Sequence, residues 1–189
     1  MKYLKIIIAI ILTGCTGDYL PKPKGFNRIV LPEAEYVPLA DTFPYYFEYS
    51  KHARILPDSS WIAEKDWITI HYPKMGASLQ ITYKPVTDSI IREYLSDSYK
   101  LTSQHNIKAY AIDESILELP NGLYASYTEL EGQVPTQVQF HITDLDSSEH
   151  FLRGALYFRM ATKNDSLAPV INYLKKDVIH LLTSLEWRD

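Results

Sequence analysis

Four consecutive segments with strand-like patterns lie between two amphipathic segments with helical spacing, and this order restricts the fold more than any other feature of the chain. Short turn sequences such as Pro120-Asn121-Gly122 separate the four segments. Consecutive strands joined by short turns pair with their neighbours as an antiparallel meander. The segments expected as strands are 109–119, 123–130, 138–145 and 151–162.

The two flanking segments have the three- and four-residue apolar spacing of helices. The first begins at the capping pair Thr87-Asp88 and ends near His105-Asn106. The second follows Asp165-Ser166 and has Pro169 in its first turn, where proline is tolerated. Its apolar stripe comprises Leu167, Val170, Ile171, Leu174, Val178, Leu181, Leu182 and Leu185.

Further strand candidates precede the first helix. Residues 67–72 and 79–83 alternate apolar and polar side chains around a turn at 73–76, which predicts a hairpin, and shorter candidates are 45–49 and 53–56. In the strand expected at 151–162, alternation places apolar and polar residues on opposite faces. Leu152, Leu156, Phe158 and Met160 share one face, and Arg153, Tyr157 and Arg159 share the other.

These patterns together predict an α+β fold. We expect an antiparallel sheet of about six to eight strands packed with two main helices, arranged as an α/β/α sandwich. One helix is N-terminal to the four-strand meander and the other is C-terminal to it.

The N-terminus has the layout of a bacterial lipoprotein signal. Lys2 and Lys5 precede a short apolar run, and the small residues Thr13-Gly14 come directly before Cys15. The run is too short to span a membrane, which requires about 20 apolar residues. Residues 1–14 are therefore expected to be a signal peptide and Cys15 the site of lipid attachment, where acyl chains such as palmitate supply the membrane anchor. An ordinary secretory signal with a coincidental cysteine is the alternative.

Cys15 is the only cysteine, so the fold cannot rest on disulfides and no cysteine is left for catalysis or metal binding. The chain is long enough to bury a core without such bonds. Its formal net charge is −4 and no basic run is longer than Lys175-Lys176, which argues against nucleic acid as a partner. Contact with the membrane is therefore expected through the acyl chains alone.

Proline divides the chain into an extended part and a folded part. Residues 15–44 are expected to form the anchor and a Pro-rich extended segment, because prolines disfavour regular structure there. Tyr19–Lys24 suits a semi-rigid tether, whereas the apolar stretch 26–39 should lie along the domain surface or form an edge strand. Residues 45–189 are expected to form a single domain.

Sequence motifs for cofactors and catalysis are weak. The glycines do not cluster as a phosphate-binding loop requires, so no nucleotide cofactor is expected. A serine nucleophile needs a sharp turn between two glycines, and the nearest match, at Ser78, lacks the second glycine. We therefore expect no catalytic residues, no cofactor and no enzymatic activity.

Metal binding is also weakly supported. The six histidines show no close pair, and single, locally hydrogen-bonded side chains are favoured over ligands. The acidic segment 144–150 could contribute carboxylates to calcium but lacks the length and central glycine of a binding loop, so a polar turn is favoured. Other carboxylates, Asp113, Glu114, Glu129 and Glu131, lie near predicted turns and are expected as solvated surface charge.

Tyrosine is unusually frequent, with 15 residues in the chain. Tyr45, Tyr46, Phe47 and Tyr49 lie close together beside the extended segment, and Trp61 and Trp67 follow. Aromatic side chains often dominate protein interfaces, so the four are a candidate partner-binding surface. The alternative is that strand alternation sends about half of them into the core.

Several stretches of this chain resemble the gliding motility lipoprotein GldD family. They are the Cys15 signal, 25–32, 43–49 and 67–74, and the resemblance covers the whole mature chain. It implies an envelope lipoprotein needed for gliding and for the associated type IX protein secretion machinery, with Cys15 as its only transferable functional residue. The order of elements also resembles the fold of PsbP and Mog1 proteins, which implies no function.

Two functional hypotheses follow. The first is a lipid-anchored, non-enzymatic scaffold that binds other gliding and secretion proteins of the envelope. The alternative is a periplasmic ligand-binding or hydrolytic domain whose site forms only in the fold, for example a deep pocket containing His141 and Asp144. The resemblance also implies that surface-exported lipoproteins of such bacteria carry a run of several acidic residues after the cysteine. Because Thr16-Gly17-Asp18-Tyr19 contains no such run, we expect the anchor in the outer membrane with the domain facing the periplasm.

Overall fold

The computed structural model describes residues 29–87, 90–104, 109–132, 134–146, 148–158 and 164–188. Cys15, the signal peptide and the tether 19–24 lie outside the described residues, as do Asp88, His105, Arg159 and Met160. Within the described part, no helix is long and apolar enough to cross a membrane.

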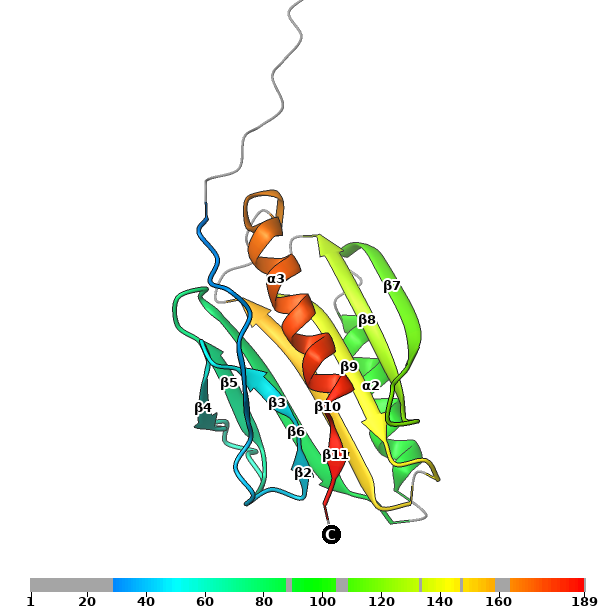
Figure 1. Ribbon diagram of the computed structural model, residues 1–189. Helices are drawn as coiled ribbons and strands as arrows, with labels where there is room; N and C mark the ends of the chain where they lie inside the picture. The colour runs from blue at the N-terminus through cyan, green and yellow to red at the C-terminus, as the bar shows by residue number, and fades with distance from the viewer. Residues whose placement is uncertain are drawn as a thin grey trace, which may run out of the picture.

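A seven-stranded antiparallel sheet is the centre of the fold (Figure 1). The four strands of the predicted meander pair in chain order, and its last strand joins the predicted hairpin, so both predictions are confirmed. In spatial order the strands are β4 (Arg54–Pro57), β5 (Ile68–Tyr72), β6 (Ala77–Pro85), β10 (His150–Phe158), β9 (Thr136–Thr143), β8 (Tyr124–Gly132) and β7 (Ala109–Glu118).

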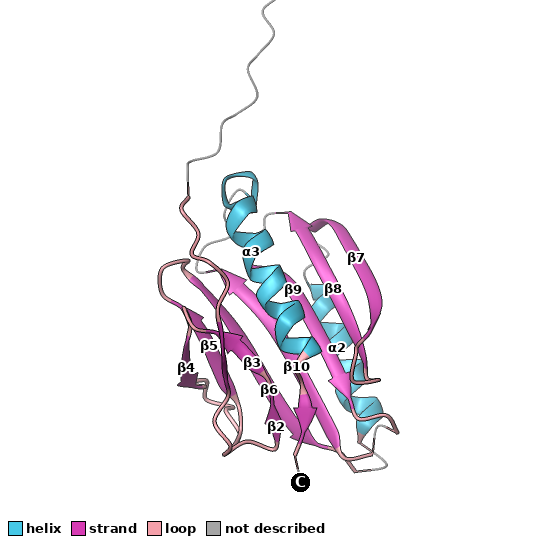
Figure 2. Cartoon of the chain, viewed as in Figure 1, coloured by secondary structure: helices cyan, strands magenta, loops and turns pink. Residues whose placement is uncertain are grey.

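Two helices lie on opposite faces of this sheet, α2 (Ile91–Ser103) and α3 (Asn164–Thr183) (Figure 2). The helix α3 lies over the apolar face, where alternate residues of the strands form the hydrophobic core. Its buried side chains Val170, Leu174 and Val178 belong to the predicted stripe. The predicted α+β sandwich with one helix on each side of the meander is confirmed.

The helix α2 is less buried than its apolar stripe predicts. Only Ser98 is fully buried in this helix, while Leu95 and Leu101 remain exposed. The reason is that the sheet face beneath it is polar, so α2 contacts it through hydrogen bonds. Ser98 Oγ lies 3.3 Å from Nδ1 of His141, and Thr102 Oγ1 donates to Gln139 Oε1 at 3.0 Å.

Two small sheets lie beside α3 and extend the core (Figure 1). The strand β1 (Tyr36–Pro38) pairs with β3 (Glu48–Ser50), and β2 (Tyr45–Tyr46) pairs with β11 (Glu186–Trp187). The single strand predicted at 45–49 is therefore divided into β2 and β3. The strand β11 follows α3 and was not predicted, because two residues are too short for an alternating pattern.

The extended segment packs against the domain from Ile29 onward. Ile29 and Leu31 are partly buried against the core, and Leu39 is fully buried. Tyr36 Oη donates to Asp177 Oδ1 of α3 at 3.1 Å, and its ring stacks on His180 with centroids 3.5 Å apart. The packed part of the chain thus includes residues before Tyr45, as expected for an apolar stretch that follows the domain surface.

Candidate functional site

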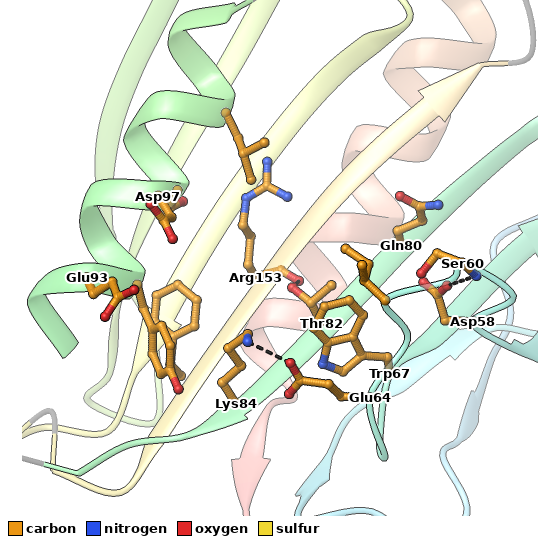
Figure 3. Close-up of a pocket in the computed structure, with 15 residues that line it drawn as sticks. Asp58, Ser60, Glu64, Trp67, Gln80, Thr82, Lys84, Glu93, Asp97 and Arg153 are labelled. Carbon is orange, nitrogen blue, oxygen red and sulfur yellow. Dashed lines mark hydrogen bonds and ion pairs between the residues drawn. The ribbon is translucent and has the colours of Figure 1, made fainter. Parts of the chain in front are cut away.

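A cleft of about 540 Å³ lies between α2 and the polar face of the sheet; we call it the α2 cleft (Figure 3). It exists because α2 covers only part of this face, which leaves the neighbouring surface of β6 open. One wall is α2, and the other is the loop 58–67 that connects β4 to β5. The volume falls within the range of clefts that bind small molecules.

The floor of the α2 cleft comes from β6 and β10. Strand alternation places Gln80, Thr82 and Lys84 of β6 on the polar face, and Phe151 and Arg153 of β10 beside them. The walls add acidic and aromatic side chains from both sides. They are Glu93, Tyr94 and Asp97 from α2, and Asp58, Glu64 and Trp67 from the loop.

Lys84 connects the two walls of the cleft. Its Nζ lies 2.8 Å from Glu64 Oε1 and above the rings of both Trp67 and Tyr94, at 5.6 and 5.2 Å from their centroids. The Trp67 indole donates to the carbonyl oxygen of Tyr83 at 2.7 Å, which fixes its orientation. The charge of Lys84 is therefore satisfied within the protein, by a carboxylate and two aromatic faces.

Arg153 is the second cation of the cleft, and it has no acidic partner among the described residues. Its Nη2 donates to Gln139 Oε1, while its Nε is buried without a hydrogen-bond partner. Burial lowers the pKa of the Arg153 guanidinium, and the nearby Tyr157 hydroxyl opposes that shift. The group nevertheless stays protonated at neutral pH, so the cleft contains a poorly compensated positive charge.

The pocket residues suggested by the sequence do not come together in this cleft. His141 lies beneath α2, where burial lowers the pKa of its imidazole and favours the neutral form. Asp144 is in the β9–β10 turn, and neither residue lines the α2 cleft. The sequence placed Arg153 on the polar face, but it could not show that α2 and the loop 58–67 would leave that face open.

The five described histidines each have a local partner. His52 contacts the carbonyl oxygen of Glu33, and His180 contacts Glu48 at 2.8 Å. Tyr83 Oη lies 2.9 Å from Nδ1 of His150. Among the described residues, no group of three His, Cys, Asp or Glu side chains could hold a metal ion.

Ser78 forms a hydrogen-bonded pair with the cross-strand residue His71, with 3.0 Å between Oγ and Nδ1. A nucleophile also needs a third group that orients the histidine. No carboxylate in the described part of the chain contacts the other ring nitrogen of His71. We therefore interpret the pair as a cross-strand contact within the β5–β6 hairpin.

The four carboxylates expected near turns all lie within strands instead, Asp113 and Glu114 in β7 and Glu129 and Glu131 in β8. Asp113 and Glu131 are exposed, Glu114 accepts from Ser126 Oγ at 3.3 Å, and Glu129 pairs with Lys175 of α3. In the acidic segment, Asp144 accepts hydrogen bonds from the backbone amides of residues 148–150, at 2.8–3.4 Å. The Asp144 carboxylate therefore organises the turn, as the polar-turn interpretation requires.

This geometry predicts a pH-dependent contribution of Asp144 to stability. Burial raises the pKa of Asp144, but its interaction with the Asp146 side chain and hydrogen bonds donated by the amides of His150, Ser148 and Glu149 outweigh burial and hold this pKa well below its usual range. A carboxyl whose pKa is lowered by folding stabilises the protein above its unfolded pKa of about 4, and this contribution disappears as the pH falls through the lowered value.

We expect Asp144→Ala to lower the free energy of unfolding by about 2 kcal/mol at pH 7, since hydrogen bonds to a charged group are lost. The difference from the native protein should shrink as urea denaturation is repeated at decreasing pH below about 4. Asp113→Asn, at an exposed position, is the matched control and should leave stability unchanged. If Asp144→Ala lowered the free energy of unfolding by the same amount at every pH, the stabilising role of the charged Asp144 carboxylate would be contradicted.

The four candidate interface aromatics do not form one surface. Tyr45 and Phe47 are fully buried in the core, so the prediction of partner contact is wrong for these two. Tyr46 and Tyr49 are half-buried, and the Arg188 guanidinium lies 4.7 Å from the Tyr46 ring centroid. Alternation within the strands explains the division, as the alternative interpretation anticipated.

The structure instead exposes apolar side chains on β7, the edge strand that follows α2. Ile112 and Ile116 share one face with Glu114 between them, Tyr110 is exposed at the irregularity near the start of β7, and Tyr124 of β8 is exposed at the adjoining end. Sequence reasoning missed this surface because the alternating pattern was assumed to face a core. An edge strand also has unpaired backbone groups available for another chain.

Comparisons with known proteins identify the family. A family model described as "Gliding motility lipoprotein GldD" matches residues 16–187. No curated protein matches the chain. Among solved structures, the chain is similar to the solution structure of cyanobacterial PsbP (CyanoP) from Synechocystis sp. PCC 6803, with a TM-score of 0.46, 8% identity, and coverage of 85% of this chain and 97% of that one. The protein belongs to the gliding motility lipoprotein GldD family.

Proposed function

We propose that this protein is a lipid-anchored, non-enzymatic scaffold that supports gliding motility and the associated type IX protein secretion machinery. The observation that carries the proposal is the family match, which extends over residues 16–187 and therefore over all but the last two residues of the segment after Cys15. Acyl chains on Cys15 supply the membrane anchor, and the domain faces the periplasm from the outer membrane.

The exposed surface of β7 supports a scaffolding role. Single exposed apolar residues are common on protein surfaces, but a row of them on a free strand edge marks a contact site for another protein. The exposed acids Asp113, Glu114 and Glu118 lie on the same strand. Two copies paired through β7 would bring these acids together, so a different envelope protein with basic residues is the favoured partner.

The proposal is tested by deleting the gene and complementing with variants, while surface spreading and secreted protein are scored in the same cultures. We expect the deletion to abolish both activities and the native chain to restore them. Cys15→Ala should fail to restore either, because the domain is then released from the membrane. Normal spreading and secretion in the deletion strain would refute the proposal.

The β7 surface is tested in the same strain set. Ile116→Lys should accumulate normally but restore spreading poorly, because the lysine disrupts an apolar contact. Leu145→Lys is the matched control, since Leu145 is 75% exposed and Ile116 68% exposed, and Leu145 belongs to the β9–β10 turn and not to β7. Equal activity of the two variants would exclude β7 as the contact surface.

A further inference from the structure

The floor of the α2 cleft includes Arg153, which has a buried hydrogen-bond donor without a partner in the described part of the chain. Among the described residues, Arg153 Nε has no hydrogen-bond partner, and neither does Nε2 of the neighbouring Gln139, which is only 2% exposed and does not line the cleft. The orientation of the Gln139 amide follows from its contacts, because Arg153 and Thr102 both donate to its oxygen and arginine cannot accept. Arg153 lines the cleft and Gln139 contacts it from behind the lining, and buried donors of this kind require an acceptor.

The acceptor that fits best is a carboxylate. The planar guanidinium of Arg153 matches the two oxygens of a carboxylate, and its positive charge has no acidic partner among the described residues. Burial of an uncompensated cation costs free energy, so an anion that binds there gains both an ion pair and hydrogen bonds with Arg153.

The remaining charges of the cleft restrict which other charged groups the ligand can carry. Glu64 is paired with Lys84 and Asp97 with Lys100, while Glu93 has no ion-pair partner in the described structure. Both walls are therefore acidic and the floor is basic (Figure 3). The acidic walls would repel a dianionic phosphate. A ligand with a carboxylate at one end and an ammonium at the other complements both the basic floor and the acidic walls.

The size and walls of the cleft favour a ligand larger than one amino acid. The cleft volume of about 540 Å³ suits a molecule of drug-like size, and Tyr94, Phe151 and Trp67 offer aromatic surface along it. At its mouth, the loop 58–67 carries Trp61 with 96% of its surface exposed, although no structural contact requires a tryptophan there.

We propose that the α2 cleft binds a short peptide through its C-terminal carboxylate, which Arg153 holds at the inner end. The positively charged end of the peptide lies toward Glu93, and its apolar side chains contact the aromatic walls. This inference does not depend on the scaffold function, since it is tested by binding in solution.

The test is calorimetric titration of the full-length protein in detergent micelles with the tripeptide Ala-Phe-Ala. We expect the free peptide to bind and its C-terminal amide to bind at least tenfold more weakly, because the amide removes the charge that pairs with Arg153. The N-acetylated peptide should also bind more weakly. Inorganic phosphate should not compete at equal concentration.

Two variants locate the site. Arg153→Met keeps the length and volume of the side chain but should weaken peptide binding at least tenfold, whereas Arg92→Met removes an exposed charge from α2 outside the cleft and should leave binding unchanged. Arg153→Met should also keep or raise the melting temperature, because it removes a buried cation that has no acidic partner among the described residues. Arg153→Lys should retain part of the binding.

Three results would overturn the proposal. The first is the absence of binding by the free tripeptide up to millimolar concentration. The second is equal binding of the free peptide and its amide, which would show that no carboxylate is recognised. The third is a large loss of melting temperature in Arg153→Met with unchanged binding, which would make Arg153 a structural residue alone.

Discussion

Replacement of Gly154 by alanine is expected to destabilise the domain by about 3 kcal/mol, since a buried side chain must be displaced to make room. Gly154 is in the middle of β10, directly opposite Phe140 of β9. A Cβ atom at this position would lie 2.2 Å from ring carbons of Phe140, and that ring is only 2% exposed. The ring fills the space that the glycine leaves, and tight core packing gives it no free volume to enter.

Urea denaturation followed by tryptophan fluorescence would measure the loss. Gly76→Asn is the matched control: Gly76 has a φ of +63° and open space around its Cβ position, and asparagine tolerates this conformation. The double variant Gly154→Ala/Phe140→Leu should recover part of the stability, because the smaller side chain removes the clash. If Gly154→Ala lowered the free energy of unfolding equally with and without Phe140→Leu, the Phe140 ring would not be the cause of the destabilisation.

Gly154 also shows which features of the fold sequence patterns can predict and which they cannot. Alternating strand segments, short turns such as 120–122 and the three- and four-residue apolar spacing of the helical segments were sufficient to predict the strands, their antiparallel order and the two helices. Each of these patterns depends on spacing between near neighbours in sequence. Fitting Phe140 against Gly154 depends on strand register instead. Register is set by turns and by the packing of all strands together, which spacing alone does not reveal.

The candidate site was less predictable for a related reason. Arg153 was placed on the polar face from its position in the strand, and that much is confirmed by its place opposite Thr82 and His141. The cleft around it requires α2 and the loop 58–67, which contribute residues distant in sequence. No motif spacing connects these segments, so the site becomes visible only when the chain is folded.

Tyr45→Ala is expected to destabilise the domain by about 4 kcal/mol, the loss typical of a large aromatic side chain removed from a core. Tyr45 has no exposed surface, and its ring lies 5.5–5.7 Å from the rings of Phe43, Phe47 and Tyr83. Its hydroxyl donates to the carbonyl oxygen of Asp66 at 2.6 Å. Tyr45→Phe removes only this hydrogen bond and should cost about 1 kcal/mol, as single buried hydrogen bonds do.

The neighbouring residue provides the comparison that separates core from surface. Tyr46→Ala removes a half-buried ring and its contact with Arg188, so the loss should stay below about 1 kcal/mol and the melt should remain cooperative. If Tyr46 contributes to partner binding, this variant should accumulate normally yet restore gliding poorly in the deletion strain. A non-cooperative melt of Tyr46→Ala would instead place Tyr46 with Tyr45 in the core, and the strand β2 would then have no side chain to offer a partner.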